Sequence, residues 1–151
     1  MGAIGHPGDI ERLRMAVIEL PLEEATPAAI QRAFAEIAQQ QSDAIIVNSI
    51  GILLPHRQLI VELAEKSRLP AIYPWRDYVE AGGLMAYASN DRELWRRMAG
   101  DVHEILNGAR PGDIPIYQPT KFEFLINLKA AKVLDLTIPT TLLATADEVI
   151  E

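Results

Sequence analysis

The sequence of 151 residues contains no cysteine. Disulfide bridges, thiol nucleophiles and zinc sites built from cysteine thiolates are therefore excluded. Basic residues are also scarce, because 14 Lys and Arg stand against 21 Asp and Glu, which gives a net charge of −7. This balance argues against a surface for nucleic acid or for an anionic membrane, since both require clustered Lys and Arg. The charges are spread along the chain, which is typical of a solvated protein surface.

Targeting signals and long apolar runs are absent as well. Residues Met1 to Asp9 carry neither the basic start nor the apolar stretch of a signal peptide, and they lack the cysteine that anchors a lipoprotein. The apolar runs are too short to cross a bilayer. We therefore expect the chain as written to stay in the cytoplasm, with residues 1–13 as an N-terminal tail outside the folded domain.

Sequence motifs for catalysis are missing too. The chain has no GxxxxGK[ST] phosphate-binding loop, no GxGxxG fingerprint and no GxSxG nucleophile elbow. His6, His56 and His103 are dispersed, and their spacing does not indicate a metal site. We therefore predict no metal, no cofactor and no enzymatic activity. An α/β enzyme is kept only as a third alternative, on fold analogy.

The first half of the chain has the pattern of an α/β protein. The composition, 49% apolar and 23% charged, suits one globular domain of ordinary size. Continuous apolar runs over 14–20, 44–47 and 69–73 predict buried strands. Helical spacing of apolar residues over 26–41 and 54–67 predicts a helix in each interval. This alternation predicts a parallel sheet with helices on its faces.

The second half continues with further strands and helices. Asn90 and Glu93 resemble a capping box at the start of a helix that ends near Gly108. Three prolines then indicate an extended connector over 109–121. The other expected elements are strands at 84–88 and 122–126 and helices at 128–134 and 142–150.

Residues that suit a small organic ligand follow two of the predicted strands. In open α/β sheets, ligands bind at the carboxyl ends of the parallel strands. Asn48 and Ser49 follow one strand, and Tyr73, Trp75 and Arg76 end the next. The aromatic rings offer flat apolar area, and the Arg76 guanidinium suits a carboxylate. The alternative is that the two rings pack under the following loop and that Arg76 faces water.

Four stretches of the second half carry a family resemblance. The sequences EAGGLMAY, ILNGARPGDIP, QPTKFEFLINLKAAK and TIP occur in that order at residues 80–87, 105–115, 118–132 and 137–139. Together they resemble the C-terminal part of the ABC-transporter substrate-binding proteins related to tryptophan-binding lipoproteins. That family has a type I periplasmic-binding-protein fold with two lobes and about twice this length. The resemblance covers roughly residues 26–151, and Asp135 stands where the family usually has glycine.

The resemblance implies a domain organisation. Residues 14–151 are expected to form the C-terminal lobe, and about 85–117 to cross to a second lobe or to a partner chain. Tyr87 then lies near the cleft between lobes, although packing in the core or hinge is an equal alternative. The helix at 90–107 exposes an apolar stripe when the first lobe is absent. We therefore expect a homodimer, formed by exchange of this segment or by simple pairing.

The resemblance also implies a function. The expected protein is the solute-binding component of an ABC uptake transporter, or a truncated half of one. It binds a small amino-acid-like ligand without catalysis, and in the parent family it delivers that ligand to a membrane permease. The implied location is periplasmic or extracytoplasmic. The alternative is a truncated, dimerising remnant that has lost ligand binding.

Overall fold

The computed structural model describes residue 12 and residues 14–89 and 91–151 of the chain. Its centre is a five-stranded sheet whose spatial order follows the chain order. The first three strands run parallel, the fourth is antiparallel to the third, and the fifth is parallel to the fourth. The strands are β1 (Ile45–Ile46), β2 (Ala71–Tyr73), β3 (Met85–Ser89), β4 (Phe122–Asn127) and β5 (Glu148–Ile150). The predicted α/β class with a mostly parallel sheet is confirmed.

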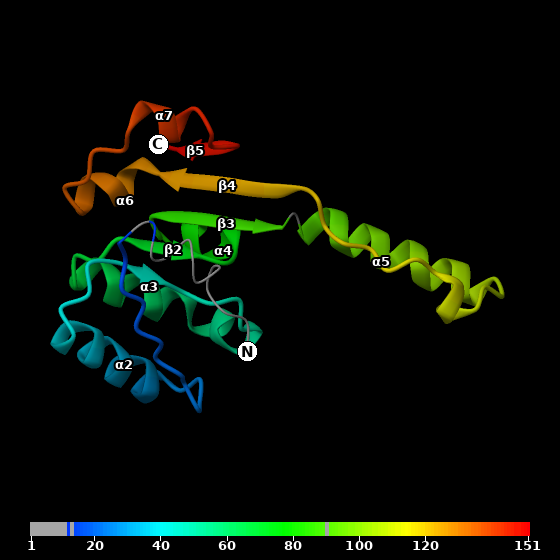
Figure 1. Cartoon of the computed structure of the whole chain (residues 1–151), viewed down its shortest axis with the longest axis horizontal. Helices are drawn as coiled ribbons and strands as arrows, with labels where there is room; N and C mark the ends of the chain where they lie inside the picture. The colour runs from blue at the N-terminus through cyan, green and yellow to red at the C-terminus, as the bar shows by residue number, and fades with distance from the viewer. Residues whose placement is uncertain (1–11, 13, 90) are drawn as a thin grey trace.

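Helices precede and connect these strands (Figure 1). The first described one begins as expected, because Oγ1 of Thr26 accepts a hydrogen bond from the N–H of Ala29 at 3.2 Å and Pro27 occupies the first turn. The α-helices are α2 (Pro27–Gln39), α3 (Arg57–Lys66), α4 (Arg76–Glu80), α5 (Asp91–Leu106), α6 (Leu128–Val133) and α7 (Thr140–Leu143). Two short 3-10 helices, Gly51–His56 and Pro111–Asp113, also lie in the described part of the chain.

The core fills one face of the sheet. Alternation along the strands sends Tyr73, Ala86 and Leu125 to this face, where α2, α3 and α4 cover them. Ile30 of α2 and Tyr78 of α4 are almost completely buried in the same cluster. Burying an apolar side chain of this size contributes about 1.5–3 kcal/mol. Packing of α2, α3 and α4 against this face therefore stabilises the sheet around β2, β3 and β4.

The opposite face of the sheet is less covered. The cross-strand register aligns Tyr87 with Phe124 and Ser89 with Phe122, so three aromatic rings share this face. The ring of Tyr87 stacks on Phe122, with centroids 5.5 Å apart, and meets Phe124 edge-on at 6.2 Å. Tyr87 nevertheless remains 55% exposed. Tyr87, Phe122 and Phe124 thus form a solvent-facing aromatic patch close to the end of β3.

Residues 91–121 form an arm that projects away from the sheet (Figure 1). The helix α5 runs outward and ends at Leu106, and Gly108 two residues later has a φ of 101°, which suits glycine. The chain then returns alongside α5, and the hydroxyl of Tyr117 donates to Oε1 of Glu93 at 3.1 Å. Lys121 pairs with the same carboxylate at 3.4 Å. We call this segment the arm, and the rest of the described residues from 14 onward the body.

The arm carries an exposed apolar stripe. The sequence predicts a stripe of Leu94, Met98, Val102, Ile105 and Leu106 at helical spacing, with Trp95 beside it. Trp95 is 64% exposed and Leu106 is 80% exposed, so Trp95 is not a core residue. The stripe consists of Trp95, Met98, Val102, Ile105 and Leu106.

Two predicted elements are wrong. Residues 14–20 form no strand, since β1 is the edge of the sheet and pairs only with β2 among the described residues. A strand needs a hydrogen-bonded neighbour, and this apolar segment has none. The expected helix at 142–150 is instead α7 followed by β5, because residues 148–150 pair in parallel with β4. Pairing with β4 overrides the local helical pattern.

Two backbone predictions concern the ends of helices. Asp135, at the end of α6, has a φ of 57°, which is the left-handed conformation expected for a residue in a glycine position. Asn90, the expected cap of α5, lies outside the described residues, as do residues 1–11 and 13 of the expected tail. Within the part of the chain that the structure describes, no helix has the length and apolar character needed to span a bilayer.

Candidate functional site

A hollow of about 570 Å³ lies where the arm leaves the body. It opens at the carboxyl ends of β2 and β3, the edge of the sheet at which ligands of open α/β folds collect. The helix α4, the first turn of α5 and the first half of β4 complete its wall. The lining consists of Trp75, Arg76, Asp77, Glu80, Ala88, Ser89, Arg92, Glu123 and Leu125.

Trp75 is the outermost ring of an aromatic stack that begins in the core. Its ring lies 6.3 Å from that of Tyr78, at an interplanar angle of 18°. Tyr78 in turn stacks on Tyr73, with centroids 4.9 Å apart and planes 10° apart. Burial raises the pKa of Tyr78 to about 12, and it also raises the pKa of Tyr73. Both tyrosines are therefore neutral, and the stack presents Trp75 to the hollow as a fixed apolar surface.

Arg76 is held by carboxylates of the body. Its Nη2 donates to Oε2 of Glu148 at 2.7 Å and lies 3.7 Å from Oε2 of Glu123. The hydrogen bond to Glu148 raises the pKa of Arg76, and the guanidinium lowers the pKa of Glu148. Because β4 and β5 supply the two glutamates, Arg76 ties the start of α4 to both of these strands.

The six predicted site residues occupy different positions. Trp75 and Arg76 line the hollow. Asn48 and Ser49 are exposed after β1, at the same edge of the sheet but outside the lining. Tyr73 is only 2% exposed, which matches the alternative of a ring packed in the core.

Tyr87 lies on the other side of the sheet from the hollow. Its neighbours in β3 alternate with it, and Ala86 faces the core while Ala88 lines the hollow. The hydroxyphenyl ring of Tyr87 therefore belongs to the aromatic patch with Phe122 and Phe124.

Five polar lining residues were missed by sequence reasoning. Asp77 and Glu80 lie three positions apart in α4, a spacing that places both on one helical face. A helix that starts after Trp75 places Asp77 and Glu80 on the same face, so their proximity can be inferred from their spacing in the sequence. Glu123 reaches the hollow because β4 runs antiparallel beside β3, with Glu123 opposite Ala88. The remaining two are Ser89, the last residue of β3, and Arg92, in the first turn of α5 at the root of the arm.

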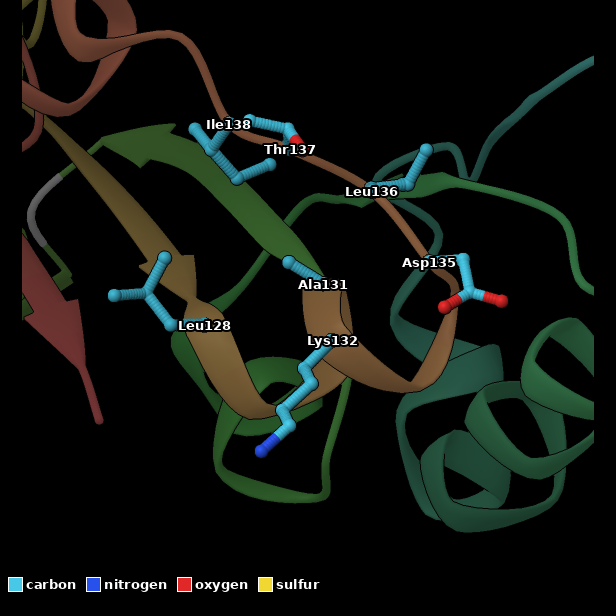
Figure 2. Close-up of a pocket in the computed structure, with 7 residues that line it drawn as sticks. All are labelled: Leu128, Ala131, Lys132, Asp135, Leu136, Thr137 and Ile138. Atoms are coloured by element: carbon cyan, nitrogen blue, oxygen red, sulfur yellow. The ribbon is translucent and has the colours of Figure 1, made fainter.

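A second hollow, of about 330 Å³, lies at the end of α6 (Figure 2). Since β4 is antiparallel to β3, the helix after β4 lies at the opposite edge of the sheet from Trp75. Figure 2 shows Lys132 pointing away from Thr137 and Ile138. Asp135 pairs with Arg68 at 3.7 Å. Its polar groups do not converge, so this hollow is the weaker candidate.

No metal site accompanies either hollow in the described residues. Three or more His, Asp or Glu side chains nowhere gather there into a group able to hold a metal ion. What the first hollow can do chemically is hold a small molecule between an aromatic surface and charged groups of both signs.

Residues 16–150 match the family model described as ABC transporter substrate binding protein. The match covers most of the chain. This chain belongs to that family. No curated protein matches the chain in the corresponding comparison.

Three solved structures share the fold of this chain. A conserved domain protein from Vibrio cholerae O1 biovar El Tor superposes with a TM-score of 0.83 at 24% identity, covering 93% of this chain and 46% of that one. An ABC domain from Streptococcus pneumoniae, in complex with L-Trp, gives 0.80 at 23% identity, covering 93% and 48%. A ligand-free, open substrate-binding protein with adhesive properties from Clostridium difficile gives 0.63 at 17%, covering 95% and 47%.

The chain thus spans about half the length of these structures. The alignments include 93% of the chain or more. Because residues 91–121 are a larger part of the chain than the share left unaligned, at least some of the arm is aligned with each structure. Part of the arm therefore has a counterpart in each of these solved structures.

Proposed function

We propose that this chain forms one lobe, residues 14–151, of a solute-binding component of an ABC uptake transporter. It supplies one wall of a ligand cleft and performs no catalysis. In this proposal the chain crosses toward the opposing lobe over residues 85–117, works with a membrane permease and acts outside the cytoplasm. Family membership over residues 16–150 supports the solute-binding role.

The observation that carries the proposal is the place of the hollow. It lies at the carboxyl ends of β2 and β3 and at the root of the arm, where a second lobe would approach. Trp75 offers a fixed ring, and ionic groups surround it. In the proposed cleft, Asn48 and Ser49 extend the wall along the same edge of the sheet. An amino-acid-like ligand suits an aromatic surface beside charges of both signs.

The streptococcal relative was solved in complex with L-Trp, which supports an amino acid as the ligand class. Because one lobe contacts a ligand from one side only, we expect weak affinity for the chain alone. Hinge closure of two lobes is the arrangement that would strengthen binding.

A thermal-shift screen of the purified chain against the amino acids tests ligand binding. Binding to the folded state alone raises stability by about 2.7 kcal/mol at a ligand concentration of 100 times the Kd. We expect a saturable rise in melting temperature with at least one amino acid, and a smaller one in Trp75→Ala. The control is Phe122→Ala, which also removes an aromatic ring but on the opposite face of the sheet. A cooperatively melting protein without any shift would contradict the proposal.

The arm supports a second proposal, that two copies pair through the segment 90–107. Its apolar stripe is exposed, and α5 projects away from the sheet (Figure 1). Each large apolar side chain that becomes buried contributes about 1.5–3 kcal/mol. A second copy can bury the stripe of Trp95, Met98 and Val102 against its own, by simple pairing or by exchange of the segment.

Analytical ultracentrifugation over a range of concentrations tests this pairing. Val102→Glu puts a charge in the middle of the stripe, and we expect it to weaken dimerisation at least about tenfold. Glu104→Gln lies on another side of the same helix and serves as the matched control. A monomer at micromolar concentration would mean that the arm is made for an opposing lobe on another chain segment.

The alternative function is a dimerising remnant without ligand binding. The uncovered apolar stripe of the arm favours the dimerisation that this alternative requires. A dimer in ultracentrifugation together with no thermal shift would establish this alternative over the solute-binding role.

A further inference from the structure

The charges around the first hollow are not equivalent. Two arginines and three carboxylates line it, which gives the lining a net charge of −1. This net charge favours a positively charged ligand group over a negatively charged one. The two arginines differ further, because one is already engaged by the body and the other is not.

Arg76 is the engaged arginine. Its Nη2 is 2.7 Å from Glu148 and 3.7 Å from Glu123, so two carboxylates compensate one guanidinium. A ligand carboxylate would have to displace Glu148 from a charge-assisted hydrogen bond. Arg76 is therefore a poor partner for a ligand carboxylate, in contrast to the expectation from sequence. It acts as a positioning residue that anchors the start of α4.

Asp77 and Glu80 are in the opposite situation. Both line the hollow from α4 and both are exposed. Neither has a hydrogen bond or a salt bridge with another described side chain, and the charge of Glu80 adds only a smaller coulombic contribution to the raised pKa of Arg76. A carboxylate pair beside an aromatic ring is a good partner for an ammonium group, which gains from the charges and from the ring face. Trp75 immediately precedes this helix and lines the same hollow.

Arg92 faces the hollow from the other side. It belongs to the first part of α5, at the root of the arm, and it makes no ion pair with another described side chain. The hollow thus has carboxylates on the side of the body and an available guanidinium on the side of the arm.

We propose that the hollow orients a zwitterionic ligand, with the ammonium at Asp77 and Glu80, the side chain over Trp75, and the carboxylate toward Arg92. This inference rests on the proposed solute-binding function and adds the direction in which the ligand lies. In this arrangement the body binds the ammonium group of the ligand, and the root of the arm binds its carboxylate. A movement of the arm relative to the body would then change the distance between Arg92 and the ligand carboxylate.

Three probes of the same ring separate the two ends. Tryptophan carries both charges, tryptamine only the ammonium, and indole-3-propionate only the carboxylate. We expect titration calorimetry of the purified chain to give measurable affinity for tryptophan and tryptamine, and at least about tenfold weaker affinity for indole-3-propionate. Equal or tighter binding of indole-3-propionate would overturn the orientation while leaving solute binding intact.

Charge-removing variants give the sharper test. Glu80→Gln should weaken tryptophan and tryptamine alike, by about fivefold to tenfold. Arg92→Gln should weaken tryptophan and leave tryptamine unchanged, since tryptamine has no carboxylate. Glu36→Gln, an exposed position of α2 outside the hollow, is the matched control and should change neither affinity.

The outcomes distinguish the two levels of the proposal. Unchanged tryptamine affinity in Glu80→Gln, or an equal loss of tryptophan and tryptamine affinity in Arg92→Gln, would overturn the inference while leaving solute binding intact. Absence of binding by all three probes, together with no thermal shift for any amino acid, would overturn the inference and the proposed function together.

Discussion

The body and the arm are built from the same kinds of residues but hold their shape in different ways. In the body, α2, α3 and α4 bury Ile30, Tyr78 and Leu125 against the sheet. In the arm, the apolar residues of α5 remain on the surface, and the return segment is tied to the helix by Glu93. Ile116, in the middle of that return segment, is fully exposed. The difference teaches that an amphipathic helix marks a packing surface but does not say which molecule or lobe will cover it.

The largest expected difference between the two regions lies in a leucine truncation. Leu125→Ala in β4 removes a side chain that is 1% exposed, and we expect the free energy of unfolding to fall by about 2–5 kcal/mol. Leu106→Ala at the end of α5 should change it by at most about 0.5 kcal/mol. Urea denaturation at low protein concentration measures both. A large loss in the Leu106 variant would mean that the arm folds together with the body.

Glycine replacement is expected to act in opposite directions in the two regions. A Cβ on Gly83 would lie 2.6 Å from Cε2 of Tyr73 and 2.7 Å from the carbonyl oxygen of Tyr78, so Gly83→Ala should cost about 1–3 kcal/mol. A Cβ on Gly100 in α5 meets nothing within 4 Å. Gly100→Ala should stabilise the helix by about 0.5–1 kcal/mol. Thermal melts followed by circular dichroism should show a lower midpoint only for the body variant.

A smaller effect is expected from the hydroxyl of Tyr78. This oxygen is buried and has no hydrogen-bond partner among the described residues. Removing a buried, unpaired hydroxyl relieves a desolvation cost, so Tyr78→Phe should leave the stability unchanged or raise it by up to about 1 kcal/mol. Denaturant melts of the wild type and the variant measure this difference. A clear loss of stability would indicate that the hydroxyl is satisfied in solution.

The smallest effect should come from the exposed ion pairs, one in each region. The folded-state pKa of Glu148 is lowered by Arg76, so its contribution is present above the ordinary value of 4.5 and disappears as the pH falls through the lower folded pKa. Glu148→Gln should therefore lower the melting temperature at neutral pH but not in strong acid. Glu93→Gln should leave the melting temperature unchanged and speed hydrogen exchange near Tyr117. A constant difference at all pH values would exclude the ion pair as the cause.

Prediction from sequence worked best where local signals and burial agree. Thr26 and Pro27 start α2, Gly108 follows the end of α5, and continuous apolar runs become β1 and β2. It failed where pairing decides the structure. Residues 148–150 carry a helical pattern yet form β5, since β4 offers a free edge in parallel register.

The candidate site follows the same division. Trp75 and Arg76 were found because residues after a buried strand lie at the ligand-binding edge of the sheet. Tyr73 is still part of β2, and its side chain is buried in the core instead. Glu123 and Arg92 were missed because they reach the hollow through the antiparallel return of the chain. Sequence order does not encode that proximity in any periodic pattern.

By itself, the sequence determined the α/β class, the family, the amphipathic helix of the arm and the aromatic and arginine residues at the end of β2. These depend on local spacing and on composition, which a chain carries before it folds. Only the tertiary structure decided that Arg76 is engaged by Glu148 and Glu123, that Tyr73 is buried, and that the arm stands away from the body. Those facts depend on which distant segments come into contact, and such contacts are set by packing of the whole chain.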